Sequence, residues 1–230
     1  MRRIIITIDG YSSCGKSTLA RQLARHLRYI FIDSGAMYRA ITLYFLRNHI
    51  SLQSNKQISQ ALSDINLEFC YNEATGDNDI FLNEENVAIP IREMLVSETV
   101  SEVSAIKAVR AFAVAQQQKI GEQKGLVMDG RDIGTTVFPH AELKIFMTAD
   151  PAVRVERRFK ELYAKNPNIT LEEVRHNLEM RDYIDSNREI SPLRKAPDAI
   201  VLDNTRLTID QQLKLALGWV KEKQQQLQAI

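Results

Sequence analysis

Short apolar runs alternate along the chain with longer segments of helical periodicity. Five runs rich in β-branched residues, most of them ending in aspartate, occur at 3–9, 29–33, 126–129, 143–147 and 199–203. Short, unbroken apolar strands are typical of a parallel sheet that helices cover on both faces. Helices are favoured by the amphipathic segments at 17–27, 36–48, 151–164 and 207–223. This alternation predicts an α/β fold with an open parallel sheet and right-handed crossovers.

One region interrupts the alternation. Between residues 67 and 89 the chain reads as short strands around clusters of turn residues, without a helical pattern. This stretch predicts a small antiparallel insert beside the main sheet. The sequence contains neither an internal repeat nor a linker rich in Pro, Gly and Ser. We therefore expect residues 1–230 to form a single domain.

Composition and charge narrow the classes of function. The 230 residues are 44% hydrophobic and 26% charged, and 30 Lys and Arg against 29 Asp and Glu leave a net charge of +1. No overall positive field therefore favours a long nucleic acid, and no apolar run is long enough to cross a bilayer. Since no secretory signal core follows the N-terminus, we expect a cytoplasmic protein without a nucleic-acid or membrane partner. The two cysteines and four histidines show no metal-ligand spacing, so a structural zinc site is not expected.

A phosphate-binding motif follows the first predicted strand. Residues 10–17, GYSSCGKS, fit the pattern G-x-x-x-x-G-K-[ST] and lead into a predicted helix. The glycines permit backbone N–H groups to converge on a polyphosphate, toward which the helix directs its positive end. Lys16 can bridge the β- and γ-phosphates, and Ser17 can offer its hydroxyl to Mg²⁺ bound between them. The motif predicts a nucleoside triphosphate site that comprises Gly10, Ser12, Ser13, Cys14, Gly15, Lys16, Ser17 and Thr18.

Further polar clusters follow two other predicted strands, DSGAMYR at 33–39 and DGRDIGTTVFP at 129–139. In such sheets ligands bind outside the carboxyl ends of the strands, and two acids around one arginine exceed what a helix cap needs. A helix cap with a salt bridge remains the alternative, above all for the first cluster. Cys14 also has two interpretations, a thiolate favoured by Lys16 and the surrounding amides, or a small residue that fills a tight loop.

Arginines recur at helical spacing in the last third of the chain. Arg154, Arg157 and Arg158 share one helical face, and so do Arg181 and Arg188. Such a stripe is either a solvated face with salt bridges or a set of cations that closes over transferring phosphoryl groups and expels water. The phosphate-binding motif favours the second interpretation.

The motifs GYSSCGKST, FIDSGAMYRAIT, IREMLVSETVSEVSAIKAVR, DGRDIGTTVFP, RDYIDSNREISPL and DAIVLDNT, taken in this order, resemble those of bacterial cytidylate kinases across almost the whole chain. The resemblance implies a P-loop NTPase core, a monophosphate-binding insert at about 67–89 and a helical, arginine-bearing lid within about 151–188. It also implies transfer of the γ-phosphoryl group of ATP to CMP or dCMP with Mg²⁺, in pyrimidine nucleotide metabolism. The expected partners are these small nucleotides, and the expected state is a monomer.

The resemblance further implies roles for individual residues. The donor phosphates would be held by Lys16, Arg154 and Arg158. The acceptor phosphate would be bound by Ser34, Arg39, Arg131 and Arg188, and its ribose by Arg181 and Asp185. The cytosine would be read by Ser101, Arg110 and Asp132. The groups expected to act in catalysis are Lys16, Arg131, Arg158 and Arg188.

Two departures from the family pattern fall in one short stretch. The chain reads NVAIPI at 86–91, where Pro90 would stiffen the hinge between insert and core, and IREMLV where the family has IRTPEV. Two alternatives to the predicted activity are a kinase for another acceptor, such as UMP, AMP or shikimate, and a nucleotide-dependent switch. The second anion site and the base-reading residues disfavour a switch, as does the absence of an NKxD guanine motif.

Overall fold

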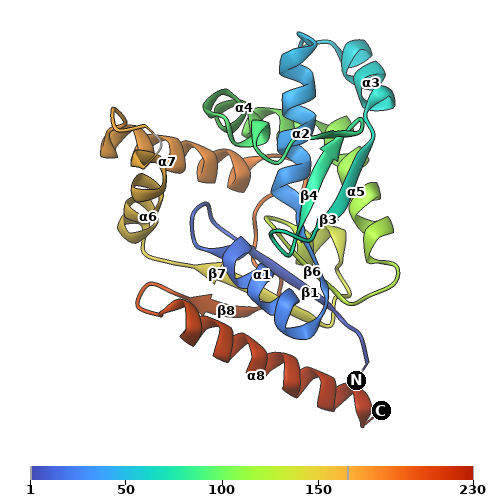
Figure 1. The fold of residues 1–230 in the computed structure, drawn as a ribbon, viewed down its shortest axis with the longest axis vertical. Coiled ribbons are helices and arrows are strands. Elements are labelled where there is room, and N and C mark those ends of the chain that lie inside the picture. Colours follow the sequence, from blue (N-terminus) through green and yellow to red (C-terminus); the bar gives the residue numbers. More distant parts are fainter. Residues whose placement is uncertain (1, 165, 230) are drawn as a thin grey trace.

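Five parallel strands form the central sheet of the computed structural model, which describes residues 2–164 and 166–229. From one edge to the other they are β2 (Ile30–Asp33), β6 (Leu126–Gly130), β1 (Ile5–Gly10), β7 (Leu143–Thr148) and β8 (Ile200–Asp203). Every neighbouring pair is parallel. The predicted strands are confirmed, with ends that differ by one or two residues. Because β1 lies between β6 and β7, the loop that follows it opens at the centre of the sheet's carboxyl edge (Figure 1).

Helices cover both faces of this sheet, as its apolar strands predict. In β1, Ile6 and Ile8 belong to a core shared with α1 (Lys16–Leu27) and α8 (Ile209–Gln228). Ile5 belongs to the opposite core, which contains a short π-helical turn, Ile133–Val137, and side chains of α5 (Lys107–Gly121). Successive strand residues point to opposite faces, so a continuous apolar run supplies both cores at once.

A helical region stands above the sheet in Figure 1. It consists of α2 (Ser34–Arg47), α3 (Asn55–Asp64), α4 (Met94–Ala105) and part of α5, which share one large apolar core. The sequence pattern did not delimit α3, α4 and α5. In α4 the reason is visible, because its buried side chains include Ser97, Ser101 and Ser104 and its apolar stripe is therefore interrupted.

The predicted antiparallel insert is confirmed. It contains β3 (Leu67–Asn72), β4 (Asp77–Leu82) and β5 (Glu85–Asn86), and its turn is tied to α1 by ion pairs from Arg21 and Arg25 to Asp77. The departure at Pro90 opens a 3₁₀ turn, Pro90–Arg92, that joins the insert to α4. Proline suits this first-turn position because its N–H would lack a helical partner there.

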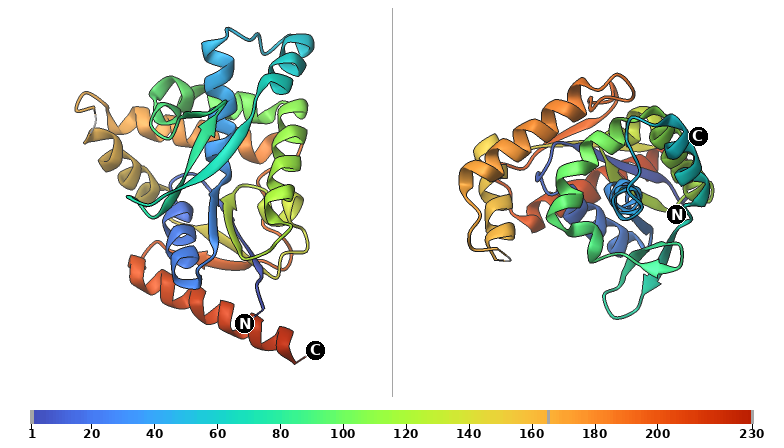
Figure 2. Two further views of the ribbon diagram at one scale, coloured as in Figure 1. Left: turned by 45° about the vertical axis from the view of Figure 1, so that its right-hand side comes forward. Right: turned by 90° about the horizontal axis from the view of Figure 1, so that it is seen from above.

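Two helices project from the sheet on the side opposite the insert, α6 (Pro151–Tyr163) and α7 (Leu171–Asn187). They enclose a small apolar core of their own around Val155, Val174 and Leu178. Both views in Figure 2 show α7 returning from the tip of this pair toward the body of the molecule, and its contacts there include α4. The pair therefore overhangs the carboxyl edge of the sheet.

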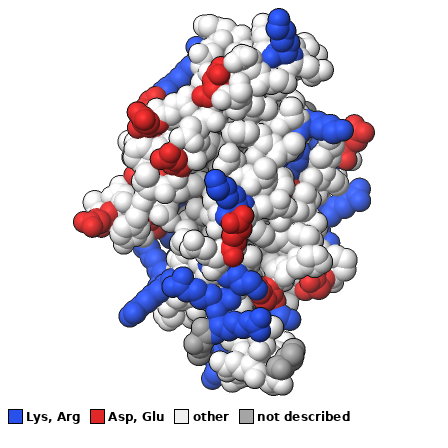
Figure 3. All heavy atoms as spheres, turned by 90° about the vertical axis from the view of Figure 1, so that its right-hand side faces the viewer, with Lys and Arg blue, Asp and Glu red and all other residues white. Residues whose placement is uncertain are grey.

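On the upper part of the face drawn in Figure 3, neither sign of charge dominates. Acidic and basic side chains are interspersed there, and Lys and Arg gather toward its lower end. Among residues 2–164 and 166–229, no helix has the combination of length and apolar composition that a membrane span requires.

Candidate functional site

Two glycines shape the loop between β1 and α1. Gly10 has a φ of 149°, and a Cβ there would lie 2.0 Å from the carbonyl oxygen of Met147. Gly15 directly precedes α1 with a φ of 87°. Both positions require glycine, the first for close approach to β7 and both for their positive φ. The loop therefore lies at the amino end of α1, where N–H groups without helical partners favour an anion.

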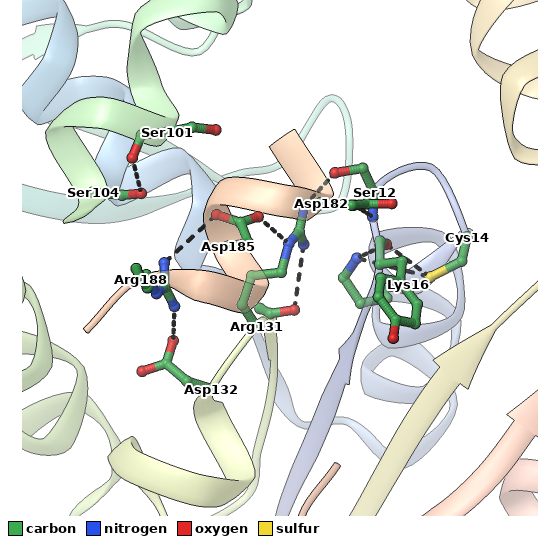
Figure 4. A network of polar contacts seen from close by, with 12 residues as sticks. Ser12, Cys14, Lys16, Ser101, Ser104, Arg131, Asp132, Asp182, Asp185 and Arg188 are labelled. Atoms are coloured by element: carbon green, nitrogen blue, oxygen red, sulfur yellow. Dashed lines mark hydrogen bonds and ion pairs between the residues drawn. The ribbon is translucent and has the colours of Figure 1, made fainter. Parts of the chain in front are cut away.

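Lys16 folds back over this loop. Its Nζ donates to the carbonyl of Tyr11 at 2.6 Å and lies 3.8 Å from Sγ of Cys14 (Figure 4). Burial lowers the pKa of Lys16, and the neighbouring cation of Arg131 lowers it further. Cys14 is buried in the apolar core and its thiol donates to Tyr11 at 3.0 Å, which favours the interpretation of a small residue that fills a tight loop.

Two carboxylates lie at the ends of adjacent strands beside Ser17. Asp33 and Asp129 are register partners in β2 and β6, and Oγ of Ser17 donates to Oδ2 of Asp129 at 2.7 Å. Within the described chain, Oδ1 of Asp129 is buried without a hydrogen-bond partner. Burial, reinforced by the charge of Asp33, raises the pKa of Asp129 to about 7. Asp33 also caps α2, since its side chain accepts from the N–H of Ala36 at 3.1 Å.

Arg131 joins three elements. Its Nε donates to Asp185 of α7 at 2.8 Å, and its Nη2 donates to Oγ of Ser12 in the glycine loop at 2.9 Å (Figure 4). Burial alone would lower the pKa of Arg131, but the carboxylates of Asp185 and Asp182 outweigh burial and raise it. The guanidinium is therefore charged and held between the loop and the overhanging helix.

Three charged side chains with little exposure form an Arg–Asp–Arg cluster, Arg110, Asp132 and Arg188. One oxygen of Asp132 accepts from Arg110 and the other accepts from Arg188 at 3.2 Å. The three side chains are between 2% and 4% exposed. Arg110 also donates to the carbonyl of Ser104 at 3.2 Å and lies over the ring of Tyr38, 5.3 Å from its centroid. Each partner is therefore fixed by at least two contacts.

The three arginines of α6, which the sequence analysis placed on one helical face, have different partners in the structure. Arg154 pairs with Asp182 and donates to the carbonyl of Ser12 at 3.2 Å, so it supports the glycine loop. Arg157 donates to the side chain and the carbonyl of Asn204, both at 3.0 Å. Arg158 pairs with Glu161 at 2.9 Å and lines the central cavity.

A cavity of about 450 Å³ opens between the glycine loop, α2, α4 and α7. It brings together most of the residues predicted from the sequence: Ser12, Ser13, Gly15, Lys16, Ser17, Thr18, Ser34, Arg39, Ser101, Arg110, Arg131, Asp132, Arg158, Arg181, Asp185 and Arg188. Three predicted residues, Gly10, Cys14 and Arg154, lie behind this lining. Arg181 faces the cavity among other cations, and burial together with those charges lowers its pKa to about 9.

The sequence did not single out several polar residues of the site. Asp182 accepts from the N–H of Ser12 at 3.0 Å, although it lies 170 residues farther along the chain. Ser104 and Tyr38 line the cavity beside Arg110. All three fall inside the quoted segments, Asp182 in RDYIDSNREISPL, Tyr38 in FIDSGAMYRAIT and Ser104 in IREMLVSETVSEVSAIKAVR. Nothing in their local spacing distinguishes them from surface residues.

Comparison with known proteins gives one consistent result. The family model for cytidylate kinase matches residues 6–222. A cytidylate kinase of Bacteroides thetaiotaomicron is 54% identical over 97% of this chain and 97% of its own, and one of Flavobacterium psychrophilum is 52% identical over 96% and 99%. The crystal structure of an uncharacterized protein from Eubacterium ventriosum covers 96% of this chain and 99% of its own at 10% identity, with a TM-score of 0.51. That last likeness concerns the fold alone.

Proposed function

The chain belongs to the cytidylate kinase family, and we propose that it transfers the γ-phosphoryl group of ATP to CMP, and to dCMP, in the central cavity. The protein is thus a nucleoside monophosphate kinase, a transferase. The observation that carries the assignment of the site is that one cavity joins a phosphate loop to a buried Arg–Asp–Arg cluster. An oxygen of the acceptor phosphate attacks the γ-phosphorus while the bond to the β–γ bridging oxygen breaks, and ADP leaves. This transfer needs positioning and charge stabilisation rather than a covalent intermediate.

The donor phosphates bind to the glycine loop. Lys16 exchanges its hydrogen bond with the neutral carbonyl of Tyr11 for the phosphate oxygens, which carry more negative charge. Arg158 is the arginine of α6 that lines the cavity, and we assign it the direct contact with the donor. Arg154 holds the loop from outside the cavity through Ser12.

The residues near Ser17 fit a magnesium ion. The hydroxyl of Ser17 and the carboxylates of Asp33 and Asp129 are the hard oxygen ligands that Mg²⁺ prefers, and the unpartnered Oδ1 of Asp129 supplies a free ligand. Ser17, Asp33 and Asp129 would hold this ion, which would supply positive charge to the donor phosphates. Asp129 and Asp33 repel each other, so their carboxylates favour a cation between them.

The acceptor phosphate and ribose occupy the middle of the cavity. We assign the phosphate to Ser34, Arg39, Arg131 and Arg188, all of which line it. Arg131 is already oriented by Asp185 and Ser12, which reduces the reorganisation needed when charge develops during transfer. The ribose hydroxyls are assigned to Arg181 and Asp185.

The base lies against Ser101 and the Arg–Asp–Arg cluster. Cytosine offers an N4 amino donor and an N3 acceptor, whereas uracil offers an O4 acceptor and an N3 donor. A carboxylate accepts and does not donate, so Asp132 favours N4 of cytosine and repels O4 of uracil. Arg110 donates and does not accept, so at N3 it favours cytosine as well. Each contact is worth about 1–3 kcal/mol of discrimination.

Replacing Asp132 by Asn tests this assignment, because the amide can also donate. We expect Asp132→Asn to narrow the preference for CMP over UMP by weakening CMP more than UMP, with the KM for ATP within about twofold of wild type. Release of ADP is measured with CMP, dCMP, UMP, AMP and shikimate, and Asp64→Asn in an exposed position of α3 serves as the control. Equal loss with CMP and UMP would assign Asp132 to the phosphate machinery instead. A wild-type protein most active with another acceptor, or equally active without one, would favour the alternative kinases or the switch.

We also propose that residues 151–188 act as a lid over the cavity and residues 67–89 as the monophosphate-binding insert of one domain, 1–230. The separate apolar core of α6 and α7 suits movement as a unit. Amide hydrogen exchange across 151–188 should fall when a bisubstrate analogue is added. Unchanged protection would contradict a closing lid.

The remaining expectations concern the protein as a whole. We propose a cytoplasmic monomer whose partners are small nucleotides rather than nucleic acid. The net charge of +1 supports the absence of a nucleic-acid partner. Sedimentation at several protein concentrations, with and without nucleotides, measures the oligomeric state.

A further inference from the structure

Asp132 is carried by a very short element. It directly precedes the π-helical turn Ile133–Val137, and its carbonyl accepts from Thr136 at 2.8 Å. Such bonds are internal to the turn, and a helical segment of five residues does not by itself fix where it lies on the sheet. Contacts from elsewhere must therefore determine where the carboxylate of Asp132 lies.

Asp9 of β1 supplies those contacts. One oxygen of its carboxylate accepts from the N–H of Ile133 at 2.8 Å, and the other accepts from the N–H of Gly134 at 2.7 Å. Asp9 is 4% exposed, and burial raises its pKa to about 6 although both amides oppose that shift. Burying a carboxylate costs free energy unless hydrogen bonds compensate for the lost water, and these two amides supply such bonds.

The π-helical turn also packs closely against β1. A Cβ at Gly134 would lie 2.8 Å from Oγ1 of Thr7 and 3.2 Å from Oδ2 of Asp9. The backbone of the turn therefore approaches the strand as closely as a glycine permits. Any change at Asp9 is transmitted to Ile133 and Gly134, and from there to the adjacent Asp132.

We propose that Asp9 is a positioning residue for base recognition, which holds the turn so that Asp132 meets Arg110 and Arg188. The proposal rests on the assignment of Asp132 to the cytosine. Gly10 follows Asp9 directly, so support of the phosphate loop is the rival role. Among the described residues, however, both oxygens of Asp9 bond to the turn, whereas the loop N–H of Ser12 bonds to Asp182.

Asp9→Asn distinguishes the two roles, because its amide donor would face one of the two N–H groups. We expect kcat/KM for CMP to fall about tenfold or more and the CMP preference over UMP to narrow, while the KM for ATP stays within about twofold. The control is Asp64→Asn, which makes the same exchange at an exposed position of α3 away from the turn. This control should change neither KM.

The double variant Asp9→Asn/Asp132→Asn ties the effect to Asp132. If Asp9 acts through Asp132, the double variant should narrow the CMP preference no further than Asp132→Asn alone. If Asp132→Asn narrows the preference for CMP over UMP but Asp9→Asn leaves it unchanged, the proposal for Asp9 is overturned, while the assignment of Asp132 stands. An unchanged preference in Asp132→Asn would instead refute the role of Asp132.

Gly134→Ala perturbs the same contact from the turn and guards against loss of folding. We expect it to reproduce the selective loss of CMP recognition, with circular dichroism and thermal unfolding confirming a folded protein. A larger rise in the KM for ATP than for CMP in Asp9→Asn would assign Asp9 to the phosphate loop. Failure of both variants to fold would show that the contact is structural, and would overturn the proposal.

Discussion

The phosphate loop and the Arg–Asp–Arg cluster use buried charge in opposite ways. Lys16 forms no ion pair within the described chain; its ammonium donates to a neutral carbonyl and lies near a second cation, Arg131. Asp132, in contrast, is shared by two guanidinium groups, and one of these also pairs with Asp185. In the first region the ammonium of Lys16 has no ion-pair partner in the described chain, which suits contact with a polyanion. The second is balanced and rigid, which suits recognition of a neutral base by its hydrogen-bonding edge.

This difference has a consequence for stability. Removing a cation that forms no ion pair in the described chain leaves no directly paired anion behind, whereas removing an anion shared by two buried cations leaves both cations uncompensated. Substitutions in the phosphate loop should therefore mainly lower activity, and removal of Asp132 from the cluster should mainly lower stability. The predictions below test that division, beginning with the largest effect.

Asp132→Ala should cost about 3–5 kcal/mol of unfolding free energy, because Arg110 and Arg188 lose their common partner in a buried environment. Denaturant unfolding measures the change. Asp64→Ala, at an exposed position of α3, is the control and should stay within about 0.5 kcal/mol of wild type. A loss below about 1 kcal/mol for Asp132→Ala would show that the cluster is solvated and not balanced in the way described here.

Lys16→Ala should have the opposite profile. We expect kcat to fall about 100- to 1000-fold, the size typical of a lost preorganised contact with developing charge. The unfolding free energy should change by less than about 1 kcal/mol, since no ion pair is broken. Turnover is followed by ADP release, and Lys107→Ala, exposed at the start of α5, is the control. Near-normal turnover in a folded variant would contradict the assignment of the phosphate loop.

The two regions also differ in how far the sequence predicts them. The phosphate loop is contiguous and its geometry follows from two glycines between a strand and a helix, so one motif predicts both its position and its chemistry. The main sheet can be predicted equally well from the sequence, because its strands are continuous apolar runs.

The Arg–Asp–Arg cluster joins residues that are 22 and 56 positions apart, on α5, beside the π-helical turn and at the end of α7. No periodicity predicts such a meeting. The resemblance assigned Arg110 and Asp132 to the cytosine and Arg188 to the acceptor phosphate, and the contact that joins all three was not predicted. Asp9 was noted as a polar residue at the end of a predicted strand, but its contacts, like those of Asp182, were not predicted, since each depends on an amide N–H more than 100 residues away. Long-range contacts of this kind are determined by tertiary packing and not by local spacing.

A third prediction uses pH and applies to the carboxylates beside the phosphate loop. Burial, reinforced by the charge of Asp33, raises the pKa of Asp129 in the folded protein to about 7, above its ordinary value of 3.8. Folded protein therefore binds more protons than unfolded protein between about pH 4 and 7, and stability falls as pH rises through that window. Asp129→Asn removes this dependence, so the variant should be more stable than wild type at pH 8 and gain little or nothing at pH 4.

Thermal unfolding across this pH range measures the difference, with Asp64→Asn as the control for a carboxylate in an exposed position. A constant difference between Asp129→Asn and wild type at all pH values would contradict the raised pKa. Such a result would also remove the evidence that the region near Ser17 is electrostatically unbalanced.

The smallest effect is expected at Cys14, because the phosphate loop acts through its backbone and Lys16 more than through its other side chains. The thiol of Cys14 is buried, donates to Tyr11 and lies outside the cavity lining, whereas Cys70 on the insert is exposed. We expect a thiol reagent to label Cys70 rapidly and Cys14 slowly, since access to a buried thiol requires local opening. Mass spectrometry after timed labelling separates the two sites, and Cys70 serves as the control within the same molecule.

Cys14→Ala should keep kcat within about threefold of wild type and cost about 1 kcal/mol of stability through lost packing. Rapid labelling of Cys14 with loss of activity would restore the interpretation of a reactive thiolate and give this loop a side-chain chemistry beyond Lys16.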